Sequence, residues 1–458
     1  EFPWLEGMFV ELGKGVVKSA PWGLMFRVCF GAMTSMIDLG TDIYVTTKFW
    51  NDKNKKGYFN ASVACLAVSL GFQLVVVFLQ KRKLGPVRTL KEAFPVFIGF
   101  KPAVDAYNIA KGKQQEAGES LDPLAEMTFT KSIEMFAEAI PGVIIQLMAI
   151  ADGGGDTAAW ISVAISALTT GYGGAIISYD FDTDPEKRQV NPDFYGYVPA
   201  NPRKRAIVFT TLVFIGSEML MIRCLTIVIL GLLGKGWALA YICVDLGLYL
   251  VVKMVRGDFW YWLPLGSGGA EFMVSLLIRV VVKLLTDFTS IVQFRHPYEL
   301  GGMYWSFGSV LTMGSLPVAI MIYERHKGND SVVNLALQLL YILIPSTLLI
   351  FIVFFLNIES KYWHTFVSTE RNKDYTTRAF RQSEDDATRA LYSLQRSKYH
   401  WKAMAEEVRG WVEANWSRWE EDKPKWYNEN IRSKIPIAWI PKKKNRGQER
   451  TKIKVHKT

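Results

Sequence analysis

The chain has 458 residues, of which 50% are apolar and 21% charged, and it holds 15 tryptophans but only four cysteines. It is too apolar for a disordered protein and too poor in cysteine for a disulfide-stabilised scaffold. The net charge is +10, and residues 359–458 contribute +9 of it, with 23 Lys and Arg against 14 Asp and Glu. Because no recognised nucleic-acid-binding module accompanies this charge, nucleic acid is not an expected partner.

Nine apolar blocks of about 20 residues follow one another along the chain, and this is the length that an α-helix needs to cross a bilayer. The sequence therefore predicts an all-α fold, a polytopic membrane helix bundle with additional re-entrant or amphipathic segments. The blocks are 23–47, 58–80, 133–151, 158–179, 206–233, 236–255, 268–290, 302–323 and 331–357.

Block 268–290 differs from the others because it carries Glu271, Arg279, Lys283 and Asp287. A lipid-facing span would not tolerate this load of charge, so we expect the block to be re-entrant or packed within the protein. About eight spans remain. Residues 93–110 form an amphipathic piece with two prolines, which we expect to be interfacial or re-entrant.

Counts of Lys and Arg orient the spans, because cytosolic loops are rich in these residues. Segment 81–131 holds nine of them and segment 180–205 holds five, whereas 151–157 holds none. We predict that the first two segments are cytosolic, that 151–157 faces outward and that both termini are cytosolic. This topology places loop 48–57 outside, although it carries Lys48, Lys53, Lys55 and Lys56.

The expected domains are a cytosolic segment 1–22, the transmembrane bundle 23–357 and a cytosolic tail 358–458. The tail favours helix from about 373 to 419 and interleaves tryptophans with basic residues. It either lies against lipid headgroups or docks on the cytosolic face of its own bundle, or it is simply a solvated basic tail. The residues expected at the membrane surface are Trp411, Trp416, Trp419, Lys442, Lys443 and Lys444.

Ionisable residues inside the apolar blocks are the most informative feature of the sequence. Asp38 and Asp42 lie four residues apart in the first block, and Glu134 and Glu138 do so in the third, so each pair shares one helix face. Each such charge costs about 3 kcal/mol if it faces lipid. The carboxylates must therefore be paired, protonated or hydrated.

Other residues extend this predicted site along later spans. Glu218, Arg223 and Asp245 lie in the fifth and sixth blocks, and Arg27 and Arg223 are the cations expected near the carboxylates. Pro141 is expected to kink the third span, because proline removes a backbone hydrogen bond. The set is interpreted either as an internal salt-bridge network or as a polar path for an ion or a lipid headgroup, and the two interpretations are compatible.

Two short segments resemble signatures of the XK-related family. Asp38-Leu-Gly-Thr-Asp42-Ile resembles the acidic signature, and Glu138-Ala-Ile-Pro141-Gly-Val-Ile-Ile-Gln146 resembles the second one, with Gly142 where the family has Gln. The resemblance covers about residues 30–180, and 200–357 by hydropathy alone. It implies a bundle of about eight spans that moves phospholipids between leaflets without ATP. It also implies that Asp38, Asp42, Glu138 and Gln146 line or brace a hydrophilic cleft.

Two alternatives stay open. The same carboxylates, interpreted as ion ligands or proton relays, favour an ion channel or a proton-coupled transporter. The Trp-rich basic tail favours a structural membrane subunit that binds a membrane-protein partner in a larger assembly.

Enzyme classes find no support in the sequence motifs. Neither a His-Glu-x-x-His motif nor a Gly-x-x-x-x-Gly-Lys-Ser/Thr loop occurs. The sequence therefore predicts an integral membrane protein that is not an enzyme, binds no cofactor or metal, and has phospholipids as its partners.

Overall fold

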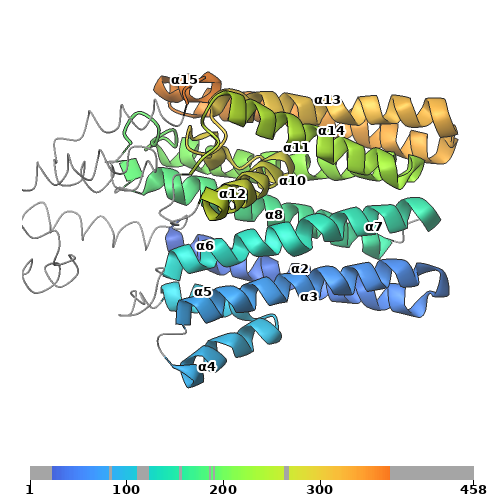
Figure 1. Cartoon of the computed structure of the whole chain (residues 1–458), viewed down its shortest axis with the longest axis horizontal. Helices are drawn as coiled ribbons and strands as arrows, with labels where there is room; N and C mark the ends of the chain where they lie inside the picture. The colour runs from blue at the N-terminus through green and yellow to red at the C-terminus, as the bar shows by residue number, and fades with distance from the viewer. Residues whose placement is uncertain are drawn as a thin grey trace, which may run out of the picture. The chain divides into compact units, whose positions relative to one another are not determined.

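The computed structural model describes residues 23–81, 85–110, 123–153, 157–184, 187–188, 191–261 and 268–371. These residues are mostly helical and contain no β-strand, which confirms the predicted all-α class (Figure 1). The predictions for segment 1–22 and for the membrane-surface residues Trp411, Trp416, Trp419, Lys442, Lys443 and Lys444 lie outside the described residues.

Seven helical stretches of the described chain are long and apolar enough to cross a membrane, which indicates an integral membrane protein. They coincide with seven of the eight predicted spans. They are Lys53–Lys81, Glu126–Asp152, Thr157–Thr183, Pro202–Leu233, Lys235–Val255, Gly302–Lys327 and Ser331–Asn357.

Helix α2 (Leu24–Asn51), which contains the first predicted span, is not among the seven although it has 28 residues. It carries four charged side chains, those of Arg27, Asp38, Asp42 and Lys48, which lower its hydropathy. Helix α12 (Gly268–Thr289), the block expected to be re-entrant or internal, is not among them either.

The remaining helices of the bundle follow the predicted blocks. They are α3 (Lys56–Lys81), α6 (Pro123–Glu134), α7 (Ile140–Gly153), α8 (Thr157–Thr183), α10 (Pro202–Leu233), α11 (Lys235–Val255), α13 (Gly302–Lys327) and α14 (Asp330–Asn357). Some consecutive pairs, such as α10 and α11 or α13 and α14, are joined by short turns.

Several of these turns lie at one end of the bundle, which we call the hairpin end (Figure 1). It comprises the α2–α3, α10–α11 and α13–α14 turns. Lys327 Nζ donates a hydrogen bond to the carbonyl of Leu232 at 2.8 Å, which ties two of them together. Tyr58 at the start of α3 donates to Asp152 at the end of α7 at 3.2 Å. We call the opposite end the loop end. It holds helices α4 (Pro86–Phe97) and α5 (Lys101–Ala110) and residues 191–201 and 358–371.

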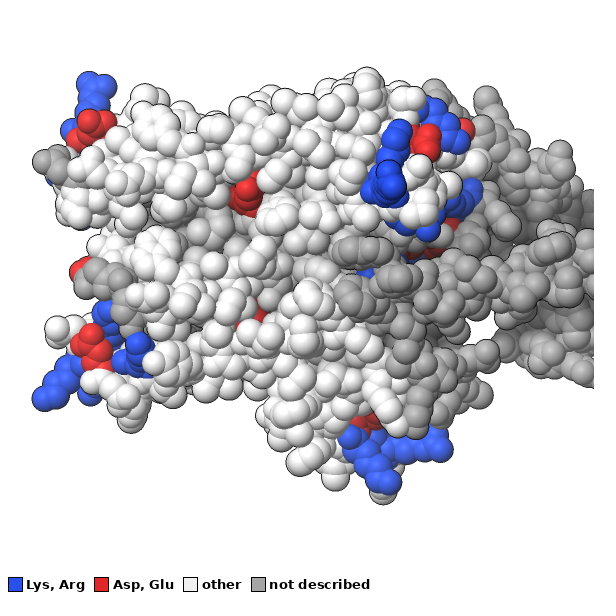
Figure 2. All heavy atoms as spheres, turned by 180° about the vertical axis from the view of Figure 1, so that it is seen from behind, with Lys and Arg blue, Asp and Glu red and all other residues white. Residues whose placement is uncertain are grey.

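The distribution of charge and burial fits a membrane. Figure 2 shows Lys and Arg gathered toward the two ends of the face it draws, with a largely uncharged region between them. Helices α8 and α10 are mostly buried, whereas α3, α11 and α14 expose most of their apolar side chains. Soluble proteins rarely expose apolar surface of this extent, and lipid tails would cover it.

The core of the bundle centres on α10, which packs against α7, α8, α11, α13 and α14. Glycines allow the closest approach: a Cβ atom on Gly216 of α10 would lie 2.9 Å from the Cα of Gly171 in α8. Small residues at such crossings are typical of helix pairs in membranes.

The amphipathic piece expected at 93–110 proves to be parts of two helices. Helix α4 (Pro86–Phe97) exposes an apolar stripe with Val87, Leu90, Phe94 and Phe97, as an interfacial helix would. Helix α5 (Lys101–Ala110) packs against α2 and α6 instead. The prediction of one piece is therefore wrong, because 93–110 is divided between an exposed helix and a packed one, and the lysine of α5 is buried between carboxylates of the bundle.

At the loop end a buried arginine holds three segments together. Arg295 in η4 (Val292–Arg295) is fully buried, and its guanidinium lies 4.2, 4.6 and 4.5 Å from the ring centres of Phe194, Tyr197 and Phe366. Its Nε donates to Thr365 Oγ1 at 3.1 Å, just before Phe366 in α15 (His364–Val367). Residues 358–371 thus pack on the bundle.

Residues 260–275 belong to a second compact unit and are described by themselves. Within it, the backbone N–H of Tyr261 donates to Ser275 Oγ at 3.2 Å. The rings of Trp260 and Phe272 lie 5.9 Å apart.

Candidate functional site

The site starts with two carboxylates of α2 that face α8 and α7, of which Asp38 is buried and Asp42 half-buried. Ser166 Oγ of α8 donates to Asp38 at 2.6 Å. Asp42, one turn further along α2, accepts from Gln146 Nε2 of α7 at 2.9 Å and from Ser162 Oγ of α8 at 3.0 Å. The four-residue spacings of the two aspartates and of the two serines place the partners in register.

One turn before Asp38 on α2, a lysine of α6 contacts the same group of polar residues. Lys131 of α6 donates a hydrogen bond to Ser35 Oγ of α2 and pairs with Glu134 at 3.0 Å. Glu134 in turn lies within electrostatic range of Asp38 and Asp42. The structure thus brings together four of the predicted residues, Asp38, Asp42, Glu134 and Gln146.

Glu138 joins this group through an unusual turn of the third span. Residues Met135–Ala139 form a turn of π-helix, in which the N–H of Ile140 bonds to the carbonyl of Met135 five residues earlier. The next residue, Pro141, has no N–H to donate, so the wider turn accommodates it and lets the helix continue into α7. Such π-turns are frequent at functional sites.

A cavity opens beside these carboxylates. Its volume is about 190 Å³, and Asp42, Glu138 and Gln146 line it together with residues of α2 and α3. Ile43, Thr47 and Val63 on its lining are exposed on the outer surface of the helices. The cavity therefore lies between two half-buried acidic groups, Asp42 and Glu138, and the lateral surface. We use the name α2 seam for the set of eight residues that meet here: Asp38, Asp42, Glu134, Glu138, Gln146, Lys131, Ser162 and Ser166.

The α2 seam holds more negative than positive charge. It contains four carboxylates, and Lys131 is the only ammonium group among the described residues that lies within ion-pair distance of any of them. Arg27 and Arg223, the cations expected near these carboxylates, form no ion pair with any of the four in the part of the chain that the structure describes. Arg27 pairs with Asp180 of α8, and Arg223 pairs within another cluster. The excess must be met by water, bound protons or a passing cation.

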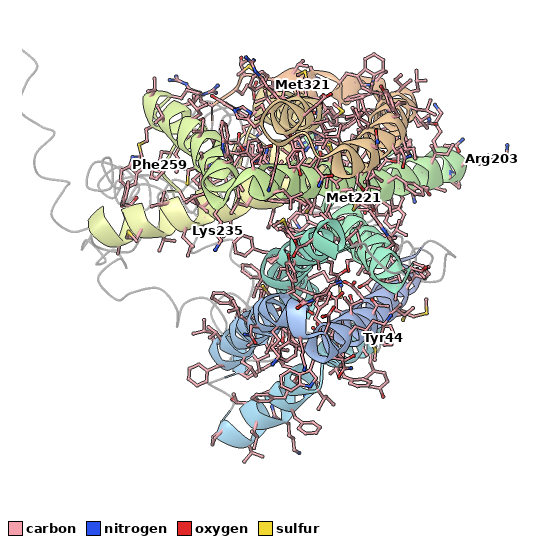
Figure 3. All side chains as sticks on the ribbon, turned by 90° about the vertical axis from the view of Figure 1, so that its right-hand side faces the viewer. Tyr44, Arg203, Met221, Lys235, Phe259 and Met321 are labelled. Atoms are coloured by element: carbon pink, nitrogen blue, oxygen red, sulfur yellow. The ribbon has the colours of Figure 1, made fainter. Side chains whose placement is uncertain are left out.

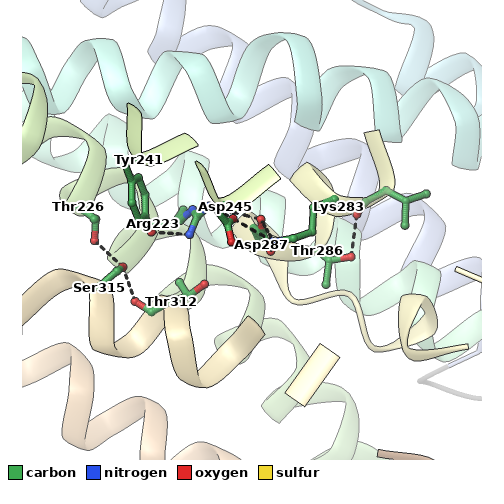
Figure 4. A network of polar contacts seen from close by, with 10 residues as sticks. Arg223, Thr226, Tyr241, Asp245, Lys283, Thr286, Asp287, Thr312 and Ser315 are labelled. Atoms are coloured by element: carbon green, nitrogen blue, oxygen red, sulfur yellow. Dashed lines mark hydrogen bonds and ion pairs between the residues drawn. The ribbon is translucent and has the colours of Figure 1, made fainter. Parts of the chain in front are cut away.

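A second buried cluster lies on α10, α11 and α12 (Figure 4). Arg223 pairs with Asp245 at 2.6 Å and Asp287 at 3.4 Å, and it donates to the hydroxyl of Tyr241. Lys283 reaches both aspartates, at 3.0 and 2.5 Å. Two cations thus face two anions. We call these four ionised residues the Arg223 cluster, and it forms a compact brace between three helices.

Glu218 belongs to neither group. It lies on α10 and accepts a hydrogen bond from Thr347 Oγ1 of α14 at 2.7 Å, in a half-buried position. The predicted site residues therefore divide into a seam, a brace and an isolated carboxylate. In the end-on view of Figure 3 the helices of the two groups occupy different halves of the bundle, with exposed Tyr44 on one and exposed Met321 on the other.

Several residues of both groups were not identified as site residues from the sequence. Ser162 and Ser166 had a usable signal, because two serines four apart in an apolar span mark a polar helix face. Lys131 lies just before the third block and was counted with the cytosolic charges. Lys283 and Asp287 were noted as an excess of charge, but the sequence did not indicate their partners.

A third ionic group lies at the loop end of the seam, where Lys101 and Asp105, outside the spanning segments, meet Glu126 at the first residue of a span. Lys101 of α5 lies between Asp105 at 2.5 Å and Glu126 at 2.8 Å. Burial opposes the charged ammonium, but Asp105 and Glu126 outweigh it and raise the pKa of Lys101 to about 12. Burial raises the pKa of Asp105 to about 6, although Lys101 opposes this shift.

Within the described part of the chain, no group of three His, Cys, Asp or Glu side chains lies close enough to hold a metal ion. The four cysteines are unpaired thiols in the helices. Comparison with known proteins finds no matching family model and no matching curated protein for this sequence.

Proposed function

We propose that this chain crosses the bilayer eight times, through α2 and the seven more apolar helical stretches. Eight crossings put residues 23 and 371 on the same side, which the Lys and Arg counts make cytosolic. The part of α12 from Leu276 onward then packs inside the bundle, where Lys283 and Asp287 meet their partners. The charges of α2 support this topology, because each is turned toward another helix or lies near an end.

We further propose that the chain is a lipid scramblase, which lets phospholipids exchange between leaflets without ATP. The observation that carries this proposal is the cavity of about 190 Å³ in which Asp42, Glu138 and Gln146 lie close to the lateral surface of the helices. The same residues carry the resemblance to the XK-related signatures, so two independent lines of reasoning meet at one place.

The chemistry of the seam suits a lipid headgroup. A zwitterionic headgroup that enters hydrocarbon loses its hydration, and polar groups along the route lower that barrier. The seam offers carboxylates to the cationic amine, and hydroxyl and amide groups to its remaining polar atoms, while the acyl chains stay in the surrounding lipid. No bond is made or broken, so on this proposal the chain is not an enzyme.

Reconstitution in liposomes tests this proposal. A fluorescent phospholipid is placed in both leaflets, and a membrane-impermeant reductant bleaches the outer leaflet. We expect bleaching well beyond half of the signal with the wild-type chain, and at least a tenfold slower second phase with Asp42→Asn/Glu138→Gln. Glu218→Gln is the matched control, since it removes a carboxylate outside the seam. Bleaching that stops at half with correctly folded wild-type protein would refute scrambling.

The excess of carboxylates favours one alternative, a proton-coupled transporter or cation channel. Four acidic groups with one lysine would bind protons or cations more readily than a balanced cluster would. Recording from planar bilayers across a pH gradient tests this alternative. A current or proton flux that Asp42→Asn/Glu138→Gln abolishes, without lipid exchange, would favour it over scrambling.

A further inference from the structure

A second and larger cavity lies at the hairpin end of α2. Its volume is about 490 Å³, and it is bounded by the last turns of α2, the short turn η1 (Lys53–Lys55), the end of α7 and the start of α8. This volume is in the range of small-molecule sites. The sequence predictions assigned no site here, and the α2 seam ends one helical turn away, at Asp42.

The lining of this cavity combines basic and apolar residues. Lys48, Lys53 and Lys55 contribute three ammonium groups, and Asn51 and Asp52 are the other polar residues of the lining. The apolar residues of the lining are Val45, Phe49, Ala149, Ile150 and Ala159. A molecule with an anionic head and a hydrocarbon tail would match both kinds of lining residue.

Two of the three lysines of the lining are available for an anion. Asp52, the acidic residue of the lining, already accepts a hydrogen bond from the N–H of Asn54 at 3.0 Å and caps η1. Neither Lys53 nor Lys55 has a carboxylate within ion-pair distance among the described residues. Three lysines against one aspartate leave the lining with a net charge of about +2 at neutral pH.

These lysines also lie at an end of the bundle where the proposed topology predicts few basic residues. The hairpin end is the outer end in that topology, and outer loops are usually poor in Lys and Arg. The neighbouring loop 151–157 follows this rule with no Lys or Arg, yet 48–57 carries four lysines. A role in binding accounts for their presence at this end.

We propose that this cavity binds a membrane phospholipid, with the phosphate on the lysines and an acyl chain on the apolar residues of the lining. Val45 and Phe49 continue the helix face of Asp38 and Asp42, so a phosphate held here lies at the entrance of the α2 seam. The role as an entrance rests on the proposed scrambling function, whereas the binding itself does not.

Binding is measured with the full chain in detergent, by titration with dihexanoyl phosphatidic acid and, in a parallel arm, with inorganic phosphate. We expect Lys53→Gln/Lys55→Gln to weaken binding of the short-chain lipid at least tenfold. Lys53→Arg/Lys55→Arg should retain it within about threefold, because the charge remains. Lys56→Gln is the matched control, since Lys56 is exposed in the same segment but does not line the cavity.

The two arms and the transport assay separate the outcomes. Binding of the lipid that depends on Lys53 and Lys55 supports the proposal, whether or not the chain scrambles lipids. Binding of inorganic phosphate with equal affinity, or equal lipid binding by Lys53→Gln/Lys55→Gln and wild type, overturns it. Failure of scrambling with retained lipid binding would refute the proposed function and leave this site standing.

Discussion

The α2 seam and the Arg223 cluster are both groups of ionisable side chains between helices, but they differ in charge balance. The Arg223 cluster pairs two cations with two anions at distances of 2.5 to 3.4 Å. The seam sets four carboxylates against one lysine and borders a cavity. A balanced cluster serves to hold helices together, whereas an unbalanced one beside open space is suited to contact with a mobile partner.

Removing one cation from the Arg223 cluster should give the largest effect. Arg223→Met leaves two buried carboxylates with Lys283 alone, and breaking such a buried pair costs about 3–5 kcal/mol. We expect a large loss of thermal stability in detergent, measured by fluorescence as the protein is heated. The double variant Arg223→Met/Asp245→Leu restores charge balance and should recover much of the loss. A single variant as stable as wild type would show that the cluster does not brace the helices.

The ionic group at the loop end allows a pH test outside the spans. Asp105 has a pKa of about 6 in the folded protein against 3.8 when exposed, so the folded state binds the proton more tightly. Its contribution to stability is then greatest below about pH 4 and is lost as the pH rises through 6. Asp105→Asn should remove this slope, on the order of 2 kcal/mol between pH 4 and pH 7.

Unfolding curves at several pH values measure this difference. Glu359→Gln is the control, because its side chain is exposed at the same end of the bundle. If the Asp105→Asn variant keeps the wild-type slope between pH 4 and pH 6, the assignment of that slope to Asp105 is wrong.

Much of the fold could be predicted because apolar blocks depend on local composition. Seven predicted spans coincide with apolar helices, and the charged block 268–290 was correctly set apart from them. The spacing of Asp38 and Asp42 placed both on one helix face for the same local reason. Their partners were not predicted, because Lys131, Ser162 and Ser166 meet them only through packing between helices. The choice of Arg27 and Arg223 as counter-ions failed for this reason, and neither cavity has a sequence signature.

A smaller effect is expected from one hydroxyl of the seam. Ser166→Ala removes the donor that lies 2.6 Å from Asp38, and a hydrogen bond to a charged group contributes about 1.5–3 kcal/mol when the acceptor cannot find another donor. A water molecule in the space left by the hydroxyl can replace the lost donor, so we expect a loss of about 1 kcal/mol or less and a scrambling rate reduced by a few fold. Thr347→Val, which removes the donor to Glu218, is the matched control for scrambling, and an equal loss of rate there would argue against a special role of the seam.

The smallest change in stability should come from a carboxylate of the α2 seam, and its contrast with Arg223→Met distinguishes the seam from the Arg223 cluster most clearly. Asp42→Asn keeps the shape of the side chain and an oxygen that accepts from Gln146 and Ser162, but it removes one of four crowded negative charges. The lost charge-assisted hydrogen bonds and the relieved repulsion oppose each other. We therefore expect the free energy of unfolding to change by less than about 1 kcal/mol, against about 3–5 kcal/mol for Arg223→Met. Because function then falls while the fold persists, lipid exchange and thermal stability measured on the same preparation distinguish a path from a brace. A loss of stability as large as that of Arg223→Met would instead make the seam a second brace.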